Sequence, residues 1–309
     1  MKKQDKDVQY PERMQIETVF GCNAKCKMCP VHFPLKEGRQ KGIMSWELFK
    51  KVVDNAAQFK DKMTKLDLWG VGDPTLDPLI VKRVDYVKKL GFKGVAIATN
   101  TELLSPELQK GLLEANLDSI IMGIDGFKKE THEKLRGVNY DKVLKNALSM
   151  IKMRNEGNYK TRFIIRFVRQ KDNMAEWDDY KAFWLNQLSK DRNDMIISYD
   201  VRAWDEEIPH KGELKRRKEI DKKPCHHIFD RLIVLVDGTI IACCGDFHKA
   251  KLALGNVNDN KSLLEIFNSG KAKAYRKLHI AGDKCKMDIC KDCTIPYSEV
   301  GEKRLLNKN

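Results

Sequence analysis

The chain has 309 residues, a formal charge of +14, nine cysteines and a hydrophobic fraction of 42%. That fraction excludes an intrinsically disordered chain, and no apolar run reaches the ~18–20 residues of a membrane span. The N-terminal residues MKKQDKDVQYPER lack the apolar segment of a secretory signal, so we expect a cytoplasmic protein without membrane association. The positive charge predicts a lysine-rich surface, with an anionic substrate or an acidic partner as alternatives. Because the basic residues are spread along the chain, nucleic acid is not favoured.

Short apolar strands alternate with amphipathic helices over the first two thirds of the chain. The expected strands are residues 14–20, 65–70, 95–99, 119–124, 162–168 and 195–201. The expected helices are residues 45–59, 78–90, 105–115, 141–154 and 175–188. This alternation predicts a parallel sheet with right-handed crossovers, here a partial (β/α)6 TIM-like barrel. Active sites of such barrels lie at the C-terminal ends of the strands.

A second, smaller region begins at Cys225. Residues 231–236 and 239–242 flank an Asp-Gly turn and predict a β-hairpin, followed by a short helix at 262–267 and a cysteine-rich tail. We therefore predict an α/β protein with a small C-terminal hairpin-plus-helix domain. The predicted divisions are an N-terminal extension (1–13), a core barrel (14–204), a linker (205–224) and a C-terminal domain (225–309).

The stretch FGCNAKCKMCP places Cys22, Cys26 and Cys29 directly after the first expected strand. Clustered cysteines in a chain without an export signal favour metal binding over disulfides. Structural zinc and electron-transfer clusters normally take four protein ligands. Three thiolates can hold three irons of a [4Fe–4S] cluster and leave the fourth iron open, as a catalytic metal centre requires. A zinc knuckle that lacks its fourth ligand is the alternative.

This C-x3-C-x2-C loop after the first barrel strand resembles the radical S-adenosylmethionine (SAM) superfamily. The resemblance implies that the open iron binds the amino and carboxylate groups of SAM. It also implies reductive cleavage of SAM to a 5′-deoxyadenosyl radical, which takes a hydrogen atom from the substrate. Met28 stands at a position that commonly lies near the adenine in this family.

Further segments resemble the family's motifs in the expected order. LWGVGDP resembles G-x-G-E-P, which implies that Gly70, Gly72 and Asp73 receive the SAM amino group, with Asp73 replacing the usual Glu. ATNTELL resembles A-T-N-G-x-L-L; Asn100 is a candidate SAM contact, and Thr101 stands where glycine is common.

MGIDGF resembles the segment that contacts the SAM ribose, with Gly123 in place of serine. The resemblance leaves that contact to Asp125 or to a water molecule. RGVNYDKVLKN also resembles the stretch that follows in the family. In RFIIRFVRQKDNMAE a basic residue is expected to pair with the SAM carboxylate; Arg166 is our candidate, and Arg169 or a surface role is the alternative.

The C-terminal cysteine pattern resembles the SPASM and twitch domains that bind auxiliary clusters in this superfamily. The shorter twitch pattern needs one set of four ligands, which implies a second [4Fe–4S] cluster on Cys225, Cys243, Cys290 and Cys293. Zinc is the alternative metal.

Four neighbours of this set have less certain roles. Cys244 is expected to be a buried small residue on the opposite strand face, and Cys285 a spare thiol or a substitute for Cys290. His226 and His227 are expected to be loop residues or donors that tune the cluster.

Two clusters and SAM together imply a radical SAM oxidoreductase. We expect it to oxidise a small polar substrate, sugar or aminocyclitol alcohol to ketone, with the auxiliary cluster as electron acceptor and flavodoxin or ferredoxin as external donor. Because 21 residues precede Cys22 in this sequence, we expect no N-terminal peptide-recognition domain. Epimerisation, peptide modification and a non-catalytic iron–sulfur protein are the alternatives; the catalytic base and the oligomeric state are not predicted.

Overall fold

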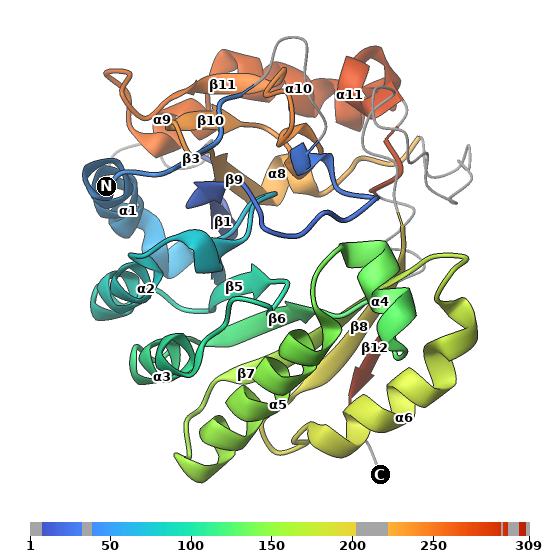
Figure 1. Ribbon diagram of the computed structural model, residues 1–309. Helices are drawn as coiled ribbons and strands as arrows, with labels where there is room; N and C mark the ends of the chain where they lie inside the picture. The colour runs from blue at the N-terminus through green and yellow to red at the C-terminus, as the bar shows by residue number, and fades with distance from the viewer. Residues whose placement is uncertain (1–7, 33–38, 202–221, 292, 296–302, 307–309) are drawn as a thin grey trace.

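One mixed sheet organises the computed structural model, which describes residues 8–32, 39–201, 222–291, 293–295 and 303–306 (Figure 1). Within these residues the strand order is β11-β10-β9-β1-β4-β5-β6-β7-β8-β12. The barrel strands are β1 (Arg13–Ile16), β4 (Lys65–Asp67), β5 (Val95–Thr99), β6 (Ser119–Gly123), β7 (Arg162–Arg169) and β8 (Met195–Asp200). They pair in parallel throughout, which confirms the expected partial (β/α)6 barrel. The expected strand at 14–20 is split, because β2 (Val19–Phe20) leaves the sheet to pair with β3 (Gly42–Ile43).

Helices cover the outer face of the barrel strands (Figure 1). They are α1 (Trp46–Ala56), α2 (Ile80–Lys89), α3 (Pro106–Glu114), α4 (Lys129–Arg136), α5 (Tyr140–Glu156) and α6 (Trp177–Gln187). Ser45 and Ser105 cap α1 and α3 by accepting from the N–H groups of Leu48 and Leu108. The sequence analysis did not predict α4. Short 3-10 helices lie at η1 (Pro30–His32), η2 (Ala57–Lys62), η3 (Pro74–Leu76), η4 (Met174–Glu176), η5 (Cys244–Asp246) and η6 (Lys284–Lys286).

The C-terminal part contains the expected hairpin of β9 (Arg231–Val234) and β10 (Thr239–Ile241). Gly238 has φ +85° in its turn, a conformation that glycine adopts without a steric penalty. The other elements are β11 (Ala253–Asn256), α8 (His227–Asp230), α9 (Leu263–Phe267), α10 (Gly270–Ile280) and α11 (Asp288–Lys291). The sequence analysis missed α10, because its sequence, GKAKAYRKLHI, buries only Ala272, Arg276 and His279 and shows no clear apolar period.

The C-terminal part continues the barrel sheet. β1 lies between β4 and β9 and pairs in parallel with both. β12 (Lys303–Leu306) lies in the segment that the sequence analysis assigned to the C-terminal domain, and it pairs antiparallel with β8 of the barrel. Most of the predicted linker, residues 202–221, lies outside the described residues, and the domain boundaries remain a prediction. No described helix has the length and apolar character needed to cross a bilayer.

Candidate functional site

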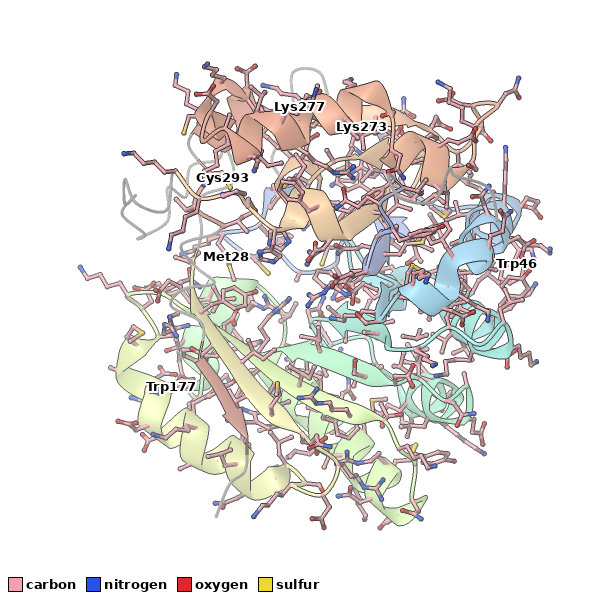
Figure 2. The ribbon with its side chains drawn as sticks, turned by 180° about the vertical axis from the view of Figure 1, so that it is seen from behind. Met28, Trp46, Trp177, Lys273, Lys277 and Cys293 are labelled. Atoms are coloured by element: carbon pink, nitrogen blue, oxygen red, sulfur yellow. The ribbon has the colours of Figure 1, made fainter. Side chains whose placement is uncertain are left out.

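A cavity of about 330 Å³ lies on the inner face of the barrel sheet; we call it the barrel cavity. Cys22, Cys26 and Cys29 line it at the carboxyl ends of the strands. Met28 lies between the barrel strands and the C-terminal part (Figure 2), and it also lines the cavity. The opposite walls come from β7, β8 and β9. The structure therefore brings the three cysteines to the mouth of the barrel, as expected from their place after the first strand.

The last turn of α4 holds the cysteine loop in place. The N–H of Lys25 donates to the carbonyl of Arg136 over 2.9 Å, and the N–H of Lys27 donates to that of Leu135 over 3.3 Å. These carbonyls lie at the C-terminus of a helix, where four oxygens lack helical partners. The loop thus satisfies the end of α4 while α4 fixes the loop.

The three thiols suit a metal cluster that supplies positive charge. Burial raises the pKa of Cys22 and of Cys29 to about 12, and nearby Asp73 and Cys26 add to these shifts. Thiolates form there when metal binding displaces their protons. Within the described part of the chain, no three His, Cys, Asp or Glu side chains are arranged to hold a single metal ion. A four-iron cluster has a different requirement, since each thiolate binds its own iron.

Two glycines let the loop after β4 approach the cysteine loop closely. A Cβ on Gly72 would lie 2.3 Å from the carbonyl oxygen of Val19 and 2.5 Å from that of Gly21. A Cβ on Gly70 would lie 2.5 Å from Cγ of Glu17. Both glycines line the barrel cavity, so their backbone is available to a ligand there.

Asp73 organises the loops around the cavity. Its carboxylate accepts from Thr75 Oγ1 over 2.6 Å, from Thr99 Oγ1 over 3.0 Å and from the N–H of Asn100 over 2.7 Å. The amide of Asn100 donates to Asn23 over 2.8 Å and approaches Cys22 Sγ at 3.6 Å. Asp73 and Asn100 both line the cavity, and their contacts tie the β4 and β5 loops to the cysteine loop.

Two arginines occupy the space that Gly123 leaves free. A Cβ on Gly123 would lie 2.1 Å from Nη2 of Arg136 and 3.1 Å from Nη2 of Arg166. Arg136 donates to the carbonyl of Gly123 over 2.7 Å, and its Nη1 lies 3.2 Å from Asp125. Asp125 is not among the described residues that line the cavity, whereas both arginines are. The guanidinium of Arg136 thus explains why serine is absent at position 123.

Arg166 and Arg169 are three residues apart in β7, so their side chains point to opposite faces of the sheet, and this decides which of them can reach SAM. Arg166 lines the cavity, and its Nε is buried without a hydrogen-bond partner among the described residues. Arg169 donates to Asp200 over 2.6 Å and to Ser198 over 2.9 Å, and is not among the described residues that line the cavity. Arg166 is therefore the better placed of the two for a cofactor carboxylate.

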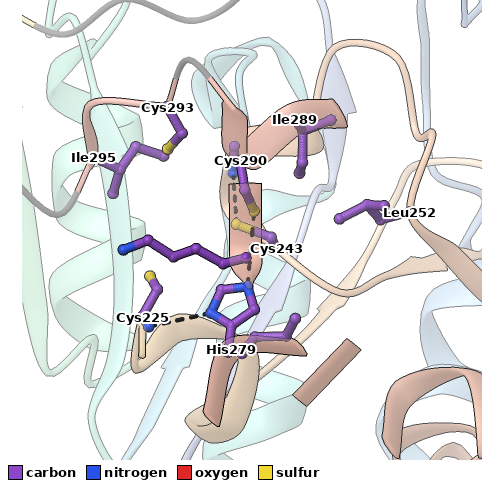
Figure 3. A pocket seen from close by; sticks show the side chains of 11 residues that line it. Cys225, Cys243, Leu252, His279, Ile289, Cys290, Cys293 and Ile295 are labelled. Atoms are coloured by element: carbon purple, nitrogen blue, oxygen red, sulfur yellow. Dashed lines mark hydrogen bonds between the residues drawn. The ribbon is translucent and has the colours of Figure 1, made fainter. Parts of the chain in front are cut away.

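A second pocket lies in the C-terminal part, with Cys225, Cys243, Cys290 and Cys293 in its wall; we call it the auxiliary pocket (Figure 3). Most of the remaining lining is apolar, for example Leu252, Ile289 and Ile295. Burial raises the pKa of the Cys290 thiol to about 12. Four converging thiols in an apolar wall fit a fully ligated iron–sulfur cluster.

His279 of α10 connects two of these cysteines, a role that the sequence analysis missed. Its Nδ1 accepts from the N–H of Cys225 over 3.2 Å, and its Nε2 lies 3.7 Å from Cys290 Sγ (Figure 3). Since Nδ1 accepts, the proton of the neutral ring is on Nε2 and points to the sulfur. Burial lowers the pKa of His279 to about 4, which favours this neutral form.

The neighbouring cysteines differ in their surroundings. Cys244 is buried and lines the barrel cavity, while its neighbour Cys243 lines the auxiliary pocket. Cys285 is exposed. His227 is buried and lines the barrel cavity, whereas His226 is exposed. Two adjacent cysteines thus face the two sites of the molecule.

The sequence analysis also missed a polar wall of the barrel cavity, formed by Arg13, Gln15, Lys65, Asp67 and Trp69. The signal was present as alternation along two strands, RMQ in β1 and KLDLW from β4 onward. Alternate residues of a strand face the same side. A polar residue at every second position of an otherwise apolar strand indicates a solvated or ligand-filled interior.

The site and fold define an enzyme class. The profile of the radical SAM superfamily matches residues 16–169, and that of the SPASM iron–sulfur cluster-binding domain matches residues 225–294. The chain belongs to the radical SAM superfamily and carries a C-terminal SPASM domain. Its cofactors are accordingly SAM and two [4Fe–4S] clusters.

Two curated relatives match part of the chain. One is a tungsten-containing aldehyde ferredoxin oxidoreductase cofactor-modifying protein of Pyrococcus furiosus, 29% identical over 179 residues, which cover 56% of this chain and 48% of the relative. The other is a probable GTP 3′,8-cyclase of Saccharolobus islandicus, 33% identical over 141 residues, which cover 45% of this chain and 44% of the relative. The match spans less than half of each relative's length.

Solved structures share the fold over nearly the whole chain. BtrN in complex with AdoMet and 2-DOIA has a TM-score of 0.62 at 15% identity, with 93% of this chain and 94% of that chain covered. Streptococcus suis SuiB bound to precursor peptide SuiA has a TM-score of 0.64 at 15% identity, with 94% and 71% covered. At these identities the likeness shows the fold alone.

Proposed function

We propose that this protein is a radical SAM dehydrogenase that oxidises an alcohol of a small polar substrate, a sugar or an aminocyclitol, to a ketone. The auxiliary cluster is the electron acceptor. The proposal rests mainly on the adjacent residues Cys243 and Cys244, which line the auxiliary pocket and the barrel cavity respectively. The two sites are thus separated by one peptide unit, a short path for an electron. Four protein ligands leave no open iron in the auxiliary pocket, which favours electron transfer over substrate binding there.

The residues around the barrel cavity divide between the cluster and SAM. In this proposal Cys22, Cys26 and Cys29 hold the first cluster, and Cys225, Cys243, Cys290 and Cys293 hold the second. The residues assigned to SAM are Met28, Gly70, Gly72, Asp73, Asn100, Asp125 and Arg166. Asp73 and Asp125 mainly position other residues of the site: Asp73 accepts a hydrogen bond from the N–H of Asn100, and Asp125 forms an ion pair with Arg136. When bound, SAM and its cluster supply the 5′-deoxyadenosyl radical that removes a hydrogen atom from the substrate.

Oxidation of a secondary alcohol to a ketone removes one hydrogen atom, one further electron and one proton. Asp67 and Asp73 are the carboxylates among the described residues that line the cavity. Both oxygens of Asp73 already accept hydrogen bonds, from Thr99 and from the N–H of Asn100. Asp67 is therefore our candidate to accept the proton. It is 4% exposed, and its Oδ1 lies 3.1 Å from Nζ of Lys65.

Anaerobic turnover tests this function. The reconstituted protein is reduced and mixed with SAM and a panel of sugars and aminocyclitols, with and without phosphate groups. We expect one 5′-deoxyadenosine per oxidised product, and a product two mass units lighter than the substrate. Cys290→Ala should lose the oxidised product, whereas the exposed Cys285→Ala should retain it.

Other results would contradict the proposal in distinct ways. Less than one 5′-deoxyadenosine per product, with unchanged product mass, would show epimerisation. No 5′-deoxyadenosine with any substrate would show a non-catalytic iron–sulfur protein. The proposal also includes a cytoplasmic location. It further includes reduction by flavodoxin or ferredoxin, which replacement of the chemical reductant in the same assay would test.

A further inference from the structure

Three cations stand side by side across the floor of the barrel cavity. Arg13, Lys65 and Arg231 are the first residues of β1, β4 and β9. The strand register places Arg13 opposite both Lys65 and Arg231. Neighbouring strands lie about 4.8 Å apart, so the three backbone positions span roughly 10 Å. All three side chains line the barrel cavity, and we call them the cationic row.

The charge of the cationic row is only partly balanced. Asp67 lies 3.1 Å from Lys65 and is the carboxylate beside the row among the lining residues. The buried Nε of Arg231 has no hydrogen-bond partner among the described residues. Like charges opposite each other on neighbouring strands destabilise a sheet. A bound anion would remove that repulsion. Against the effect of burial, nearby Cys244, Asp67 and Asp230 raise the pKa of Arg231, so carboxylates offset only part of the three positive charges of the row.

The wall next to the cationic row offers unsatisfied polar atoms. Gln15 is 1% exposed and donates to the carbonyl of Trp69 over 3.0 Å, so its amide is fixed. Its Oε1 and the indole Nε1 of Trp69 are buried without hydrogen-bond partners among the described residues. Buried polar atoms are nearly always paired, and unpaired ones indicate a missing partner. A free acceptor and a free donor beside a cationic floor suit a polar, anionic molecule.

We propose that the cationic row binds a phosphate group of the substrate, so that the substrate is a phosphate ester of a small polyol. This assignment rests on the dehydrogenase function proposed above and specifies its substrate. A phosphate monoester carries a charge of about −1.5 to −2 at neutral pH and offers three acceptor oxygens to the three cations of the row, where one carboxylate offers two. Arginine also binds phosphate oxygens through paired N–H groups.

The dimensions of the barrel require more than a phosphate ion. Gly70 lies five positions after Lys65, and an extended chain rises about 3.3 Å per residue, so the floor and the SAM-facing loop are at most roughly 16 Å apart along β4 and the segment that follows it. The body of the ester would cross the intervening space, where Gln15, Asp67 and Trp69 line the wall. Its hydroxyl groups can pair with the Oε1 and Nε1 atoms that lack partners.

Calorimetric titration of the anaerobic holoenzyme with inorganic phosphate tests this site. The buffer is phosphate-free, the ionic strength is constant, and succinate serves as the carboxylate probe. We expect phosphate to bind at least tenfold more tightly than succinate. Arg13→Gln and Arg231→Gln should each weaken phosphate binding at least tenfold. Lys273→Gln, on the exposed face of α10 (Figure 2), should leave binding unchanged.

Two results would overturn the assignment. One is that Arg13→Gln and Arg231→Gln proteins with normal iron content bind phosphate with an affinity within twofold of that of the unaltered protein. The other is equal affinity for succinate, which would indicate a carboxylate substrate. If either variant fails to fold, Lys65→Gln replaces it in the same titration, and the same tenfold loss is expected. An affinity within twofold of the unaltered protein would again overturn the assignment.

The titration is independent of turnover. Normal phosphate binding without product would contradict the dehydrogenase and not the anion site. Oxidation of a neutral sugar, together with phosphate affinity that does not change when the cationic row is substituted, would contradict the anion site and not the dehydrogenase.

Discussion

Thr101 adopts a backbone conformation that suits glycine. It follows β5 with φ +75°, at the position where the superfamily resemblance places glycine. Its side chain is fully buried, and its hydroxyl has no hydrogen-bond partner among the described residues. A β-branched residue with positive φ is strained, by roughly 1–2 kcal/mol for an L-residue in this region.

We therefore expect Thr101→Gly to raise the free energy of unfolding by about 1 kcal/mol, after the entropy that glycine adds to the unfolded chain. Thr101→Ala is the matched control, because it removes the hydroxyl and keeps the Cβ. Urea unfolding measures both variants. Equal stabilisation by alanine would assign the effect to the hydroxyl and contradict the backbone explanation.

His279 should tune the auxiliary cluster through its N–H directed at Cys290. A hydrogen bond to a ligand sulfur stabilises the more negative, reduced cluster. A net hydrogen-bond energy of roughly 0.5–1.5 kcal/mol corresponds to about 20–60 mV for one electron. We expect His279→Phe to lower the midpoint potential of this cluster by that amount in an EPR-monitored redox titration.

Two variants control for a general disturbance of the auxiliary pocket. His279→Gln retains an N–H donor and should recover part of the potential. His226→Phe changes an exposed ring beside Cys225 and should have no effect. A shift in His226→Phe as large as that in His279→Phe would refute the hydrogen-bond explanation.

His132 should make stability depend on pH. It is fully buried in α4, where its Nδ1 accepts from the N–H of Asp125 over 3.2 Å. Burial, with a smaller contribution from Arg136, lowers the pKa of His132 from 6.5 to about 3. Between these pH values the unfolded chain binds a proton that the folded chain does not. The free energy of unfolding should therefore decrease as the pH is lowered through this window, by up to about 1.4 kcal/mol per pH unit.

Urea unfolding at pH 5, 6 and 7 measures this slope. His132→Gln should flatten it, because glutamine has no proton to gain in this range. An unchanged slope in the variant would assign the pH dependence to other groups.

At the scale of elements, β1 and the loop after it join the two halves of the molecule. Glu17 is fully buried and forms an ion pair with Arg39, and it also accepts from the N–H of Val236 over 3.2 Å. Arg39 in turn donates to the carbonyl of Phe247 and lies over the ring of Phe20 at 4.2 Å. Burial raises the pKa of Glu17 despite the opposing effect of Arg39. The pair thus links the barrel to the C-terminal part.

We expect Arg39→Met to destabilise the protein by about 3–5 kcal/mol, because it leaves a buried carboxylate without a partner. The double variant Glu17→Gln/Arg39→Met should recover most of that loss, since the charge is then absent. Thermal and urea unfolding of both variants test this. A double variant as unstable as the single one would show that packing rather than charge dominates.

At the scale of the whole molecule, two cysteine sets imply two separable clusters. We expect about eight irons per chain in the unaltered protein and about four after Cys22→Ala/Cys26→Ala/Cys29→Ala, from two four-iron clusters. Cys290→Ala/Cys293→Ala should remove the other four. Cys244→Ala/Cys285→Ala is the matched control and should retain eight. Four irons together with zinc in the unaltered protein would remove the electron-acceptor argument.

The sequence predicted most of the barrel because its signals are local. The alternation of strands and helices and the Asp-Gly hairpin turn each depend on residues close in the chain. The sequence analysis missed α10, whose buried face includes Arg276 and His279 rather than a regular apolar stripe. It also did not predict that residues 303–306 pair with β8, since strand pairing depends on long-range contacts.

The cysteine spacings and glycine-rich turns by themselves determined the superfamily, because three thiols in one loop can leave an open iron wherever the loop lies. Only the tertiary structure decided which side chains share a space. It placed the guanidinium of Arg136 in the space that Gly123 leaves free. It placed Cys243 in the auxiliary pocket and its neighbour Cys244 in the barrel cavity. It also brought together the three residues of the cationic row, which lie far apart in the sequence. Substrate recognition depends on residues that are far apart in the sequence and adjacent in the fold, since the cavity is formed by strands from different parts of the chain.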